Sequence, residues 1–399
     1  MIIKKLFISN IRNLQPQEIN TAHQTVFLLG KNGQGKTSVL EAVFLLSHLR
    51  SFRSTTLLDV ININPTEELK KSPRLKNKEA FVRAILETNL GEVELAVSIN
   101  GKKREFLLNG KKITSVEKFC GILKTVLFTP EDLEIVKGAP QIRRQFLDRI
   151  LVMLDPKDIG ILNDYSKKLK IRNHLLKQKD YKAANLFNNQ LIQLNIEIVK
   201  KRVNLVNLLQ LKIGDLYSEI SGVENENFQL VYQSTFFNEV ENDFRSLEEC
   251  QQLFFEQEQR ESILGRTALG CHKDELKIEF HHNDLRTNSR ITSSQGQTRT
   301  KVLSFKLASA QIIHDITGKW PILLLDDVEA ELDSDRSRNL RKRVFSYQGQ
   351  VFITGTSLEL DKNEKADYVE FVIEKGNIER KKDLEKSTFD EEQKPDLTP

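Results

Sequence analysis

The chain contains Gly30-Lys31-Asn32-Gly33-Gln34-Gly35-Lys36-Thr37, a stretch that matches the phosphate-binding pattern G-x-x-x-x-G-K-[ST]. Residues 25–29, directly before it, are mostly apolar and predict a short strand. A helix is predicted to follow this stretch, because the next apolar residues have helical spacing: Val39, Leu40, Val43, Phe44 and Leu46. Because the pattern needs a strand before it and a helix after it, these flanks predict a P-loop in an α/β fold.

The residue types in this loop suit a nucleotide phosphate. Glycines let backbone N–H groups turn toward phosphate oxygens, and the N-terminus of the following helix adds partial positive charge. Lys36 can reach the β- and γ-phosphates, which makes it a catalytic candidate, and Thr37 can offer its hydroxyl to Mg²⁺. The predicted cofactor-binding residues are Gly30, Lys31, Asn32, Gly33, Gln34, Gly35, Lys36, Thr37 and Ser38.

Two carboxylates near the other end of the chain can complete this site. Residues 322–325 are all apolar and predict a buried parallel strand, which is followed by Asp326 and Asp327. Ligands of open α/β sheets bind at the carboxyl ends of the strands. We therefore expect Asp326 to hold Mg²⁺ beside Thr37, and Asp327 to polarise the attacking water. The alternative is that the paired acids only cap a strand.

A second glycine-containing loop opens a later helix. It is Ser293-Ser294-Gln295-Gly296-Gln297-Thr298-Arg299-Thr300, and a mostly buried helix is predicted to follow. Its N–H groups and the Ser294 hydroxyl could hold a phosphate, but the P-loop already binds the nucleotide of its own chain. A two-fold homodimer resolves this, because Ser294, Gly296 and Gln297 of each copy would then cap the γ-phosphate in the other. ATP would hold such a dimer together, and hydrolysis would release it.

The segments between these motifs predict further strands and a helical region. Residues 2–8 alternate apolar and polar like an edge strand. Two Asn-Gly pairs, at 100–101 and 109–110, indicate type I′ turns in an antiparallel meander. Residues 139–220 have helical spacing, with one long helix from Phe187. This region predicts a helical arm or small bundle, too short for a long coiled coil.

Several charged segments leave two interpretations open. Basic residues face either solvent or DNA, both in the polar loop 51–80 and in the helical region. Glu131 and Asp132 either favour a helix N-terminus or lie in a nucleotide-sensing loop. The acidic stretch 237–262 is not expected to face DNA, and His272 is expected to be structural. The basic residues in question are Lys70, Lys71, Arg74, Lys76, Lys78, Lys167, Lys168, Lys170, Arg172, Lys200, Lys201 and Arg202.

The bulk composition fits a soluble protein of two or three domains. The chain has 399 residues, 39% of them hydrophobic, and a net charge of +4 from 60 basic and 56 acidic residues. Such a nearly balanced charge does not by itself indicate nucleic acid. Cys120, Cys250 and Cys271 show no metal spacing, and we expect reduced thiols. We see neither a signal peptide nor a membrane-spanning apolar run, so we expect a cytoplasmic protein without a membrane partner.

The order of the motifs is similar to that of ABC-type ATPase heads. A P-loop is followed by a late Ser-x-Gly-Gln, then by an apolar run with Asp-Asp and by Glu-Leu-Asp. Within that class the chain resembles the RecF family over residues 1–380. The segments that carry the resemblance are residues 10–13 (Asn-Ile-Arg-Asn), 128–133 (Phe-x-Pro-Glu-Asp-Leu), 136–138 (Val-Lys-Gly), 143–148 (Arg-Arg-x-Phe-Leu-Asp), 294–300 (Ser-Gln-Gly-Gln-x-Arg-Thr) and 324–328 (Leu-Leu-Asp-Asp-Val).

The resemblance implies the same site residues and a biological role. Residues 30–38 would bind ATP with Mg²⁺, and the loop at 294–297 would act on the nucleotide of a second copy. Glu131 and Asp132 would lie in the segment that senses the nucleotide, and Asp333 in the loop that crosses the dimer. RecF-like proteins are weak ATPases that dimerise on ATP and bind double-stranded DNA near single-strand gaps. They act with RecO and RecR to promote RecA loading in recombinational repair and replication.

Two residues differ from the pattern of the family, and several other classes of P-loop protein were weighed against it. Cys271 and Lys273 stand where the family more often has Pro and Arg, and lysine lacks the planar guanidinium fork. Residues 355–356 leave no His at the switch position of ABC transporters, which disfavours a transport ATPase. The helical region is too short for a chromosome-structure ATPase, and a small-molecule kinase would leave residues 294–299 unexplained. Another ABC- or SMC-like repair ATPase head with different partners is the alternative.

These inferences predict an α/β fold, an ABC-type P-loop ATPase head with a mixed sheet, an antiparallel β subdomain and an inserted helical arm. Residues 1–138 would form the N-terminal part of the head, 139–225 the arm and 226–380 the C-terminal part of the head. Residues 381–399 are charged and polar, and they predict a disordered tail.

Overall fold

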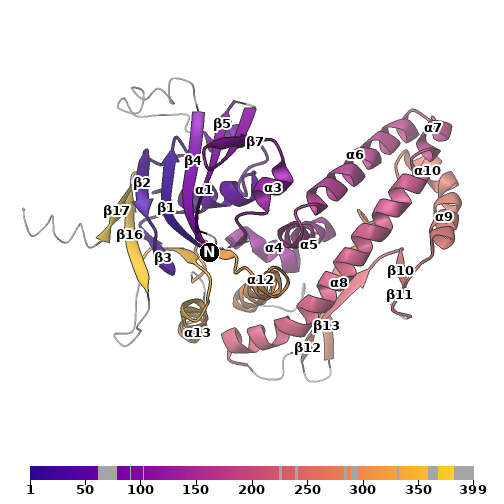
Figure 1. Ribbon diagram of the computed structural model, residues 1–399. Helices are drawn as coiled ribbons and strands as arrows, with labels where there is room; N and C mark the ends of the chain where they lie inside the picture. Colours follow the sequence, from indigo (N-terminus) through magenta and orange to yellow (C-terminus); the bar gives the residue numbers. More distant parts are fainter. Residues whose placement is uncertain are drawn as a thin grey trace, which may run out of the picture. The chain divides into compact units, whose positions relative to one another are not determined.

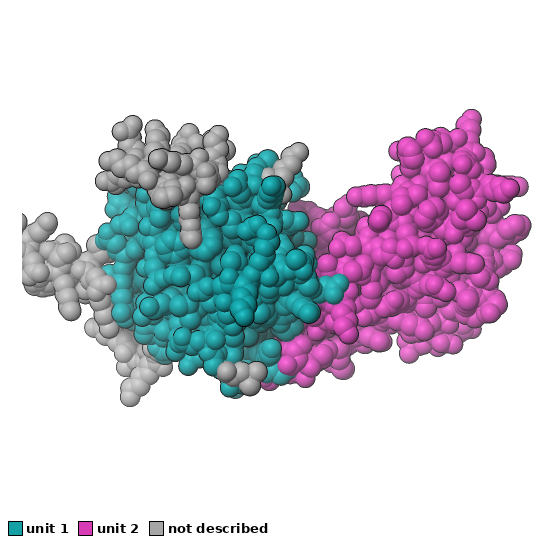
Figure 2. All heavy atoms as spheres, turned by 45° about the horizontal axis from the view of Figure 1, so that its top comes forward, with its two compact units in different colours: residues 1–130, 318–399 teal, residues 131–317 magenta. Residues whose placement is uncertain are grey.

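The computed structural model describes residues 1–381 apart from several gaps. The gaps are residues 62–78, 90, 102, 224–226, 239–240, 283–284, 289–294, 330–331 and 358–366. The chain divides into two compact units: unit 1 comprises residues 1–130 and 318–399, and unit 2 comprises residues 131–317 (Figure 2). The basic residues between 70 and 78, Ser294, the Glu of the Glu-Leu-Asp segment (Glu331) and the predicted tail from 382 onward lie outside the described residues.

Unit 1 contains a six-stranded mixed sheet, in the order β17-β16-β3-β15-β14-β8. Figure 1 labels β17, β16 and β3 of this sheet. All neighbours pair in parallel except β17, which is antiparallel to β16. The strands are β3 (Thr25–Leu29), β8 (Thr125–Phe128), β14 (Ile322–Leu325), β15 (Val351–Gly355), β16 (Tyr368–Glu374) and β17 (Asn377–Arg380). The predicted strands at 25–29 and 322–325 are confirmed, and β14 is buried between two parallel neighbours.

A second sheet of unit 1 is antiparallel throughout, in the order β2-β1-β4-β5-β6-β7. The strands are β1 (Ile2–Ser9), β2 (Gln17–Asn20), β4 (Glu79–Thr88), β5 (Gly91–Asn100), β6 (Lys103–Leu108) and β7 (Lys111–Ile113). The meander is confirmed, and Asn109 (φ 49°) and Gly110 (φ 72°) form its β6–β7 turn, as type I′ requires. Asn100 pairs with Lys103 and ends β5, so the turn predicted at 100–101 is wrong in register.

The strand predicted at residues 2–8 is confirmed, but its place at a sheet edge is wrong. β1 lies between β2 and β4 and pairs with both. Alternation of apolar and polar residues reports a sheet with one buried face, and interior antiparallel strands show it as well as edge strands do. The edges of this sheet are β2 and β7.

Helix α1 (Lys36–His48) lies between the two sheets of unit 1. It contacts β4 and β5 of the antiparallel sheet and β8 and β15 of the mixed sheet. Its buried residues run almost without interruption from Lys36 to Ser47, as expected of a helix covered on all sides. The other helical segments of unit 1 are η1 (Leu57–Val60), α3 (Val116–Cys120) and α13 (Ser334–Phe345).

Unit 2 combines helices with a three-stranded antiparallel sheet, in the order β13-β12-β9. The helical segments are η3 (Pro130–Leu133), α4 (Glu134–Lys137), α5 (Pro140–Leu154), α6 (Asp158–Lys177), α7 (Tyr181–Asn185), α8 (Asn188–Ser221), α9 (Leu247–Glu256), α10 (Glu258–Leu264) and α12 (Gln295–Thr317). The strands are β9 (Asn227–Gln233), β10 (Phe237–Asn238), β11 (Asp243–Phe244), β12 (Glu275–His282) and β13 (Leu285–Asn288). The predicted helical region 139–220 is confirmed as four helices, α5 to α8.

The predicted long helix from Phe187 is α8, which has 34 residues. Its buried apolar side chains recur at the spacing seen in the sequence and pack against α12 and β9. α12 is itself buried along most of its length. Among the described residues, no helix is both long and apolar enough to cross a membrane. The limits predicted for the head, the arm and the tail stay predictions.

Candidate nucleotide-binding site

The predicted P-loop connects β3 to α1 in unit 1 with left-handed backbone at three glycines. Gly30, Gly33 and Gly35 have φ of 152°, 80° and 119°. A Cβ at Gly30 would lie 2.5 Å from the carbonyl oxygen of Ile373, so no larger residue fits there. At Gly33 a Cβ would meet no described atom within 4 Å, which leaves open space along the loop backbone. The loop therefore has the tight turns and the open backbone that a phosphate group needs.

Lys36 is buried beneath this loop. Its ammonium donates to the carbonyl oxygens of Gly30 (2.6 Å) and Lys31 (3.2 Å), and the residue is only 5% exposed. A buried cation at a helix N-terminus provides a site for an anion, because both the charge and the helix dipole favour negative groups. The residues present thus fit a nucleotide phosphate.

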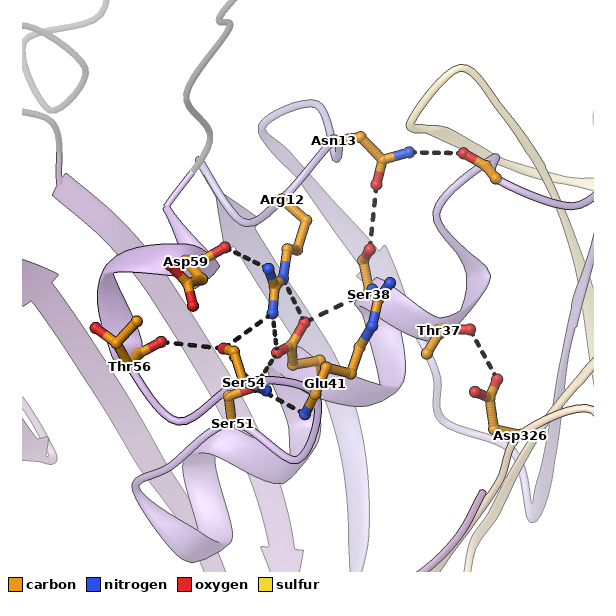
Figure 3. Close-up of polar contacts among 12 residues, drawn as sticks. Arg12, Asn13, Thr37, Ser38, Glu41, Ser51, Ser54, Thr56, Asp59 and Asp326 are labelled. Atoms are coloured by element: carbon orange, nitrogen blue, oxygen red, sulfur yellow. Dashed lines mark hydrogen bonds and ion pairs between the residues drawn. The ribbon is translucent and has the colours of Figure 1, made fainter. Parts of the chain in front are cut away.

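Thr37 and Asp326 come together at the carboxyl ends of the parallel strands (Figure 3). The Thr37 hydroxyl donates to Asp326 Oδ1 at 2.9 Å, and the Thr354 hydroxyl donates to the same oxygen at 2.8 Å. Asp326 is 6% exposed. A carboxylate and a hydroxyl are hard oxygen donors of the kind that Mg²⁺ prefers, so this pair fits the predicted metal position. Thr354, at the end of β15, was not identified from the sequence.

Asp327 adopts a backbone conformation that is uncommon outside glycine. Its φ is 44°, and its backbone N–H donates to the Thr354 hydroxyl at 2.9 Å. Strained positions of this kind tend to occur at functional sites, where the surrounding structure enforces them. Asp326 accepts hydrogen bonds from two hydroxyl groups, whereas Asp327 lies in the turn that follows. The two carboxylates therefore have different surroundings.

Asn13 supports the P-loop from outside. Its amide donates to the carbonyl oxygen of Gly33 at 3.0 Å, and its Oδ1 accepts from the Ser38 hydroxyl at 3.1 Å (Figure 3). Gln34 fastens the loop from another side, because its side chain accepts from the backbone N–H of Lys375 at 2.6 Å. In the sequence, Asn13 belongs to the segment 10–13 that carries the resemblance, but no pattern indicated a role for its side chain.

A buried ion pair joins α1 to the segment that follows it. The Arg12 guanidinium makes two 2.8 Å hydrogen bonds to Glu41, which is fully buried, and these hold the pKa of Arg12 above its ordinary value. Ser51 also donates to Glu41, and Arg12 donates to the Ser54 hydroxyl at 3.3 Å (Figure 3). Ser51 and Ser54 therefore anchor the start of the segment 51–80, because a carboxylate in a buried helix needs partners. Several of residues 51–60 are nevertheless exposed, as expected of a polar loop.

The remaining predicted site residues belong to unit 2. Gly296 and Gln297 lie in the first turn of α12, and both are partly exposed. Ser294, the residue expected to touch the phosphate, lies outside the described residues. The capping of a nucleotide in a second copy by these residues stays a prediction.

Residues 143–148, which carry part of the resemblance, contact residues 270–275, where its two departures lie, inside unit 2. Arg143 donates to the Glu275 carboxylate at 2.7 Å, and Arg202 bridges Asp148 (2.8 Å) and the carbonyl oxygen of Cys271 (2.8 Å). These contacts make residues 143–148 and 270–275 part of a polar core. Lys273 is exposed, so the replacement of the family's more common Arg by Lys lies on the surface of unit 2.

His272 and Asp274 share this buried surrounding. Burial lowers the pKa of His272 to about 4, and its ring Nδ1 lies 2.6 Å from the Tyr165 hydroxyl. Burial raises the pKa of Asp274 to about 6, and Asp274 accepts a 2.7 Å hydrogen bond from Tyr232. A neutral, partly buried histidine with a hydrogen-bond partner fits the expected structural role.

Comparison with known proteins gives consistent results. A profile of the RecF/RecN/SMC N terminal domain family matches residues 2–378. The DNA replication and repair protein RecF of Streptococcus gordonii is 34% identical over 382 residues, which cover 95% of this chain and 100% of that protein. The same protein name belongs to a relative from Geotalea uraniireducens, 31% identical over 90% of this chain and 94% of its own.

Solved structures agree with the fold. The recombination mediator protein RecF with ATP in the RecFOR pathway is 28% identical, covers 95% of this chain and 97% of its own, and superposes with a TM-score of 0.81. The Smc head bound to the C-winged helix domain of ScpA is 14% identical and covers 96% of this chain and 100% of its own, with a TM-score of 0.57. The predicted fold class, an ABC-type ATPase head with mixed and antiparallel sheets and added helices, is confirmed.

Proposed function

The chain belongs to the RecF family, and from this premise we propose that it is a weak ATPase whose nucleotide-dependent dimerisation controls its binding to DNA. Relatives named as DNA replication and repair proteins support a role in that process. The observation that carries the proposal is the hydrogen bond between Thr37 and Asp326 beside a glycine-rich loop. It joins the two halves of the proposed nucleotide site, which are far apart in sequence.

Different residues of unit 1 would bind the phosphates, hold Mg²⁺ and orient the attacking water. The backbone N–H groups of Gly33 and Gly35 and the ammonium of Lys36 would bind the phosphates. Thr37 and Asp326 would hold Mg²⁺, which neutralises charge on the phosphates when bound. Asp327 would orient a water molecule for attack on the γ-phosphate. The solved relative with ATP supports ATP as the nucleotide.

Dimerisation would place the start of α12 on the nucleotide of a second copy. Ser294, Gly296 and Gln297 would cap the γ-phosphate there, as the resemblance implies. Because the cap would recognise only the triphosphate, ATP would stabilise the dimer and ADP would not. Slow hydrolysis would then set the lifetime of the dimer, which suits a switch better than a metabolic enzyme.

The dimer would bind double-stranded DNA near single-strand gaps, in the cytoplasm, and act with RecO and RecR to promote RecA loading. A solved relative assigned to the RecFOR pathway supports these partners. Binding would depend mainly on phosphate contacts, so it should weaken steeply with salt and show little sequence preference.

DNA affinity measured with different nucleotides tests this function. Fluorescence anisotropy with a gapped duplex should show tight binding with Mg-ATP and weak binding with Mg-ADP. The Lys36→Ala variant should bind weakly with either nucleotide, because it lacks the buried cation. Equal affinity with ATP and ADP in the wild-type protein would contradict the proposal.

A further inference from the structure

A buried threonine, Thr354, lies near the end of β15 in unit 1. The residue is only 2% exposed. Valine has nearly the same shape and an equal preference for strands, so it would fill this place without introducing a polar group. A buried hydroxyl costs free energy unless it is hydrogen-bonded, so packing alone does not explain the choice of threonine.

The strand that carries Thr354 lies between the two strands that end at the candidate site. On one side β15 pairs in parallel with β14, where Ile353 is opposite Leu325, the residue before Asp326. On the other side it pairs in parallel with β3, which leads into the P-loop, and Thr354 is opposite Leu28. The register of the sheet therefore brings Thr354 level with Asp326.

The hydroxyl of Thr354 makes two hydrogen bonds of fixed direction. It accepts from the backbone N–H of Asp327 at 2.9 Å and donates to Oδ1 of Asp326 at 2.8 Å. A backbone N–H can only donate and a carboxylate oxygen can only accept, so the hydroxyl proton points to Asp326. One hydroxyl thus holds the side chain of one acid and the backbone of the next.

Each of these two bonds holds a feature that the proposed chemistry needs. Asp326 is the proposed metal-binding carboxylate, and ligating carboxylates keep their orientation through hydrogen bonds to neighbouring groups. Asp327 has φ of 44°, which a residue with a side chain rarely adopts, and Thr354 accepts from its N–H. Thr37 also donates to Asp326, but its hydroxyl is itself a proposed Mg²⁺ ligand. Both hydrogen bonds of the Thr354 hydroxyl, in contrast, go to the acidic pair.

We propose that Thr354 is a positioning residue of the nucleotide site, whose hydroxyl fixes the Asp326 carboxylate for Mg²⁺ and the backbone turn that directs the Asp327 side chain. This inference rests on the proposed function as an ATPase. Thr354 acts only through the two acids, whereas the P-loop and Lys36 bind the phosphates without it. Loss of its hydroxyl should therefore impair what depends on Mg²⁺ and on the attacking water, and leave phosphate binding intact.

Three substitutions in the full chain separate the hydroxyl from the packing of the side chain. Thr354→Val removes the hydroxyl, Thr354→Ser keeps it, and Thr354→Cys replaces it by a thiol, which forms weaker hydrogen bonds. Thr125→Val is the matched control. Thr125 is also 2% exposed, and its hydroxyl lies 2.7 Å from that of Ser47. It lies opposite Ile322, at the other end of β14 from Asp326.

Binding of a fluorescent ATP analogue, in EDTA and over a range of Mg²⁺ concentrations, is measured together with steady-state phosphate release. In EDTA every variant should bind the analogue like the wild type, because the P-loop is unchanged. Thr354→Val should need more Mg²⁺ for its half-maximal effect and release phosphate about 10–100-fold more slowly, the usual cost of losing a group that orients a metal ligand. Thr354→Ser should restore both properties, and Thr354→Cys should lie between the two.

The proposal is overturned if Thr354→Val has the Mg²⁺ dependence and the phosphate release of the wild type, or if Thr354→Ser loses as much as Thr354→Val. Urea unfolding of all variants checks stability, and a loss of phosphate release that Thr125→Val shares would also overturn it. If Thr354→Val does not fold, the comparison of Thr354→Cys with Thr354→Ser decides. Failure of the proposed function has a separate sign, which is a wild-type protein in which Mg²⁺ changes neither analogue binding nor phosphate release.

Discussion

Thr37 and Asp326 are 289 positions apart in the chain, yet the Thr37 hydroxyl donates a 2.9 Å hydrogen bond to the Asp326 carboxylate. They meet because α1 begins just after β3 while β14 ends at the same edge of the same parallel sheet. The contact brings together the two features from which the sequence predicted a nucleotide site. It also provides a position at which that site can be tested by substitution.

Asp326→Asn should reduce Mg²⁺-dependent ATP hydrolysis by about 100-fold, as expected when a group that stabilises developing charge is lost. The fold should be retained, because asparagine keeps an oxygen that can accept from Thr37 and Thr354. Asp335→Asn is the control, since Asp335 is 82% exposed on α13. The measurement is steady-state phosphate release with and without Mg²⁺. Unchanged hydrolysis in Asp326→Asn would show that Asp326 does not hold the metal.

Asn13→Ala should weaken ATP binding by about tenfold, because two hydrogen bonds that hold the P-loop are removed. Thermal stability should change less than nucleotide affinity, since Asn13 is exposed. Asn20→Ala, at the exposed end of β2, serves as the control. Titration with a fluorescent ATP analogue measures the effect. If both variants bind ATP like the wild type, Asn13 does not support the loop.

Gly376→Ala should destabilise the fold by at least about 3 kcal/mol. Gly376 has φ of 82°, and a Cβ there would lie 1.9 Å from the carbonyl oxygen of Asn13. Gly318→Ala is a matched control with φ of 67° and no described atom within 4 Å, so it should lose only about 1–2 kcal/mol from left-handed backbone. Urea unfolding of both variants provides the comparison. Equal losses would mean that the close approach to Asn13 is relieved at little cost.

Glu41→Gln should destabilise unit 1 by about 3 kcal/mol, because it removes the charge that holds Arg12 in a buried pair. The exposed pair between Arg83 and Glu18, joined by one hydrogen bond at 2.9 Å, offers a surface control. Glu18→Gln should lose less than about 1 kcal/mol, since surface pairs contribute little. Chemical denaturation at low and high salt measures both. A Glu41→Gln loss no larger than that of Glu18→Gln would contradict a role for burial.

His272 and Asp274 predict opposite effects of pH on stability. The pKa of Asp274 is raised from 3.8 to about 6, so its contribution falls as pH rises between those values. The pKa of His272 is lowered from 6.5 to about 4, so its contribution falls as pH drops through that range. Each shift corresponds to about 3 kcal/mol, and in the wild type the two largely cancel.

Asp274→Asn should remove the effect of Asp274 and leave that of His272. The free energy of unfolding of the variant should then rise by about 3 kcal/mol relative to that of the wild type as the pH rises from 4 to 6.5. Denaturation curves across this range measure the difference. A variant profile parallel to that of the wild type would show that the Asp274 pKa is not raised in the folded protein.

The sequence predicted what local patterns encode. The P-loop, its flanking strand and helix, the apolar strand before Asp326 and the long helix α8 all have periodic or motif signals, and all are present. The partners of those elements could not be predicted in the same way. The contact of Gln34 with Lys375 spans 341 positions, and that of Glu41 with Arg12 joins a turn to a buried helix. Such contacts depend on the tertiary fold and leave no periodic pattern.

Two predictions were wrong, those for β1 and for Asn100, and each has a physical cause. β1 alternates because one face of its sheet is buried, and that pattern does not say whether a strand has one neighbour or two. Asn100 belongs to a strand although Asn-Gly favours a turn, because pairing with Lys103 extends the hairpin by one residue. For Asp132 the sequence left a helix N-terminus and a nucleotide-sensing loop open, and neither pattern indicates its buried partner Lys306.

Sedimentation velocity of the wild-type protein and of Ser294→Arg, each with Mg-ATP and with Mg-ADP, tests the central claim most directly. The account predicts a dimer only for the wild type with ATP, because arginine at position 294 would block the cap on the second nucleotide. Both proteins should still bind ATP. A wild-type protein that binds ATP yet stays monomeric, or a Ser294→Arg variant that dimerises equally well, would contradict an ATP-switched dimer built on this loop.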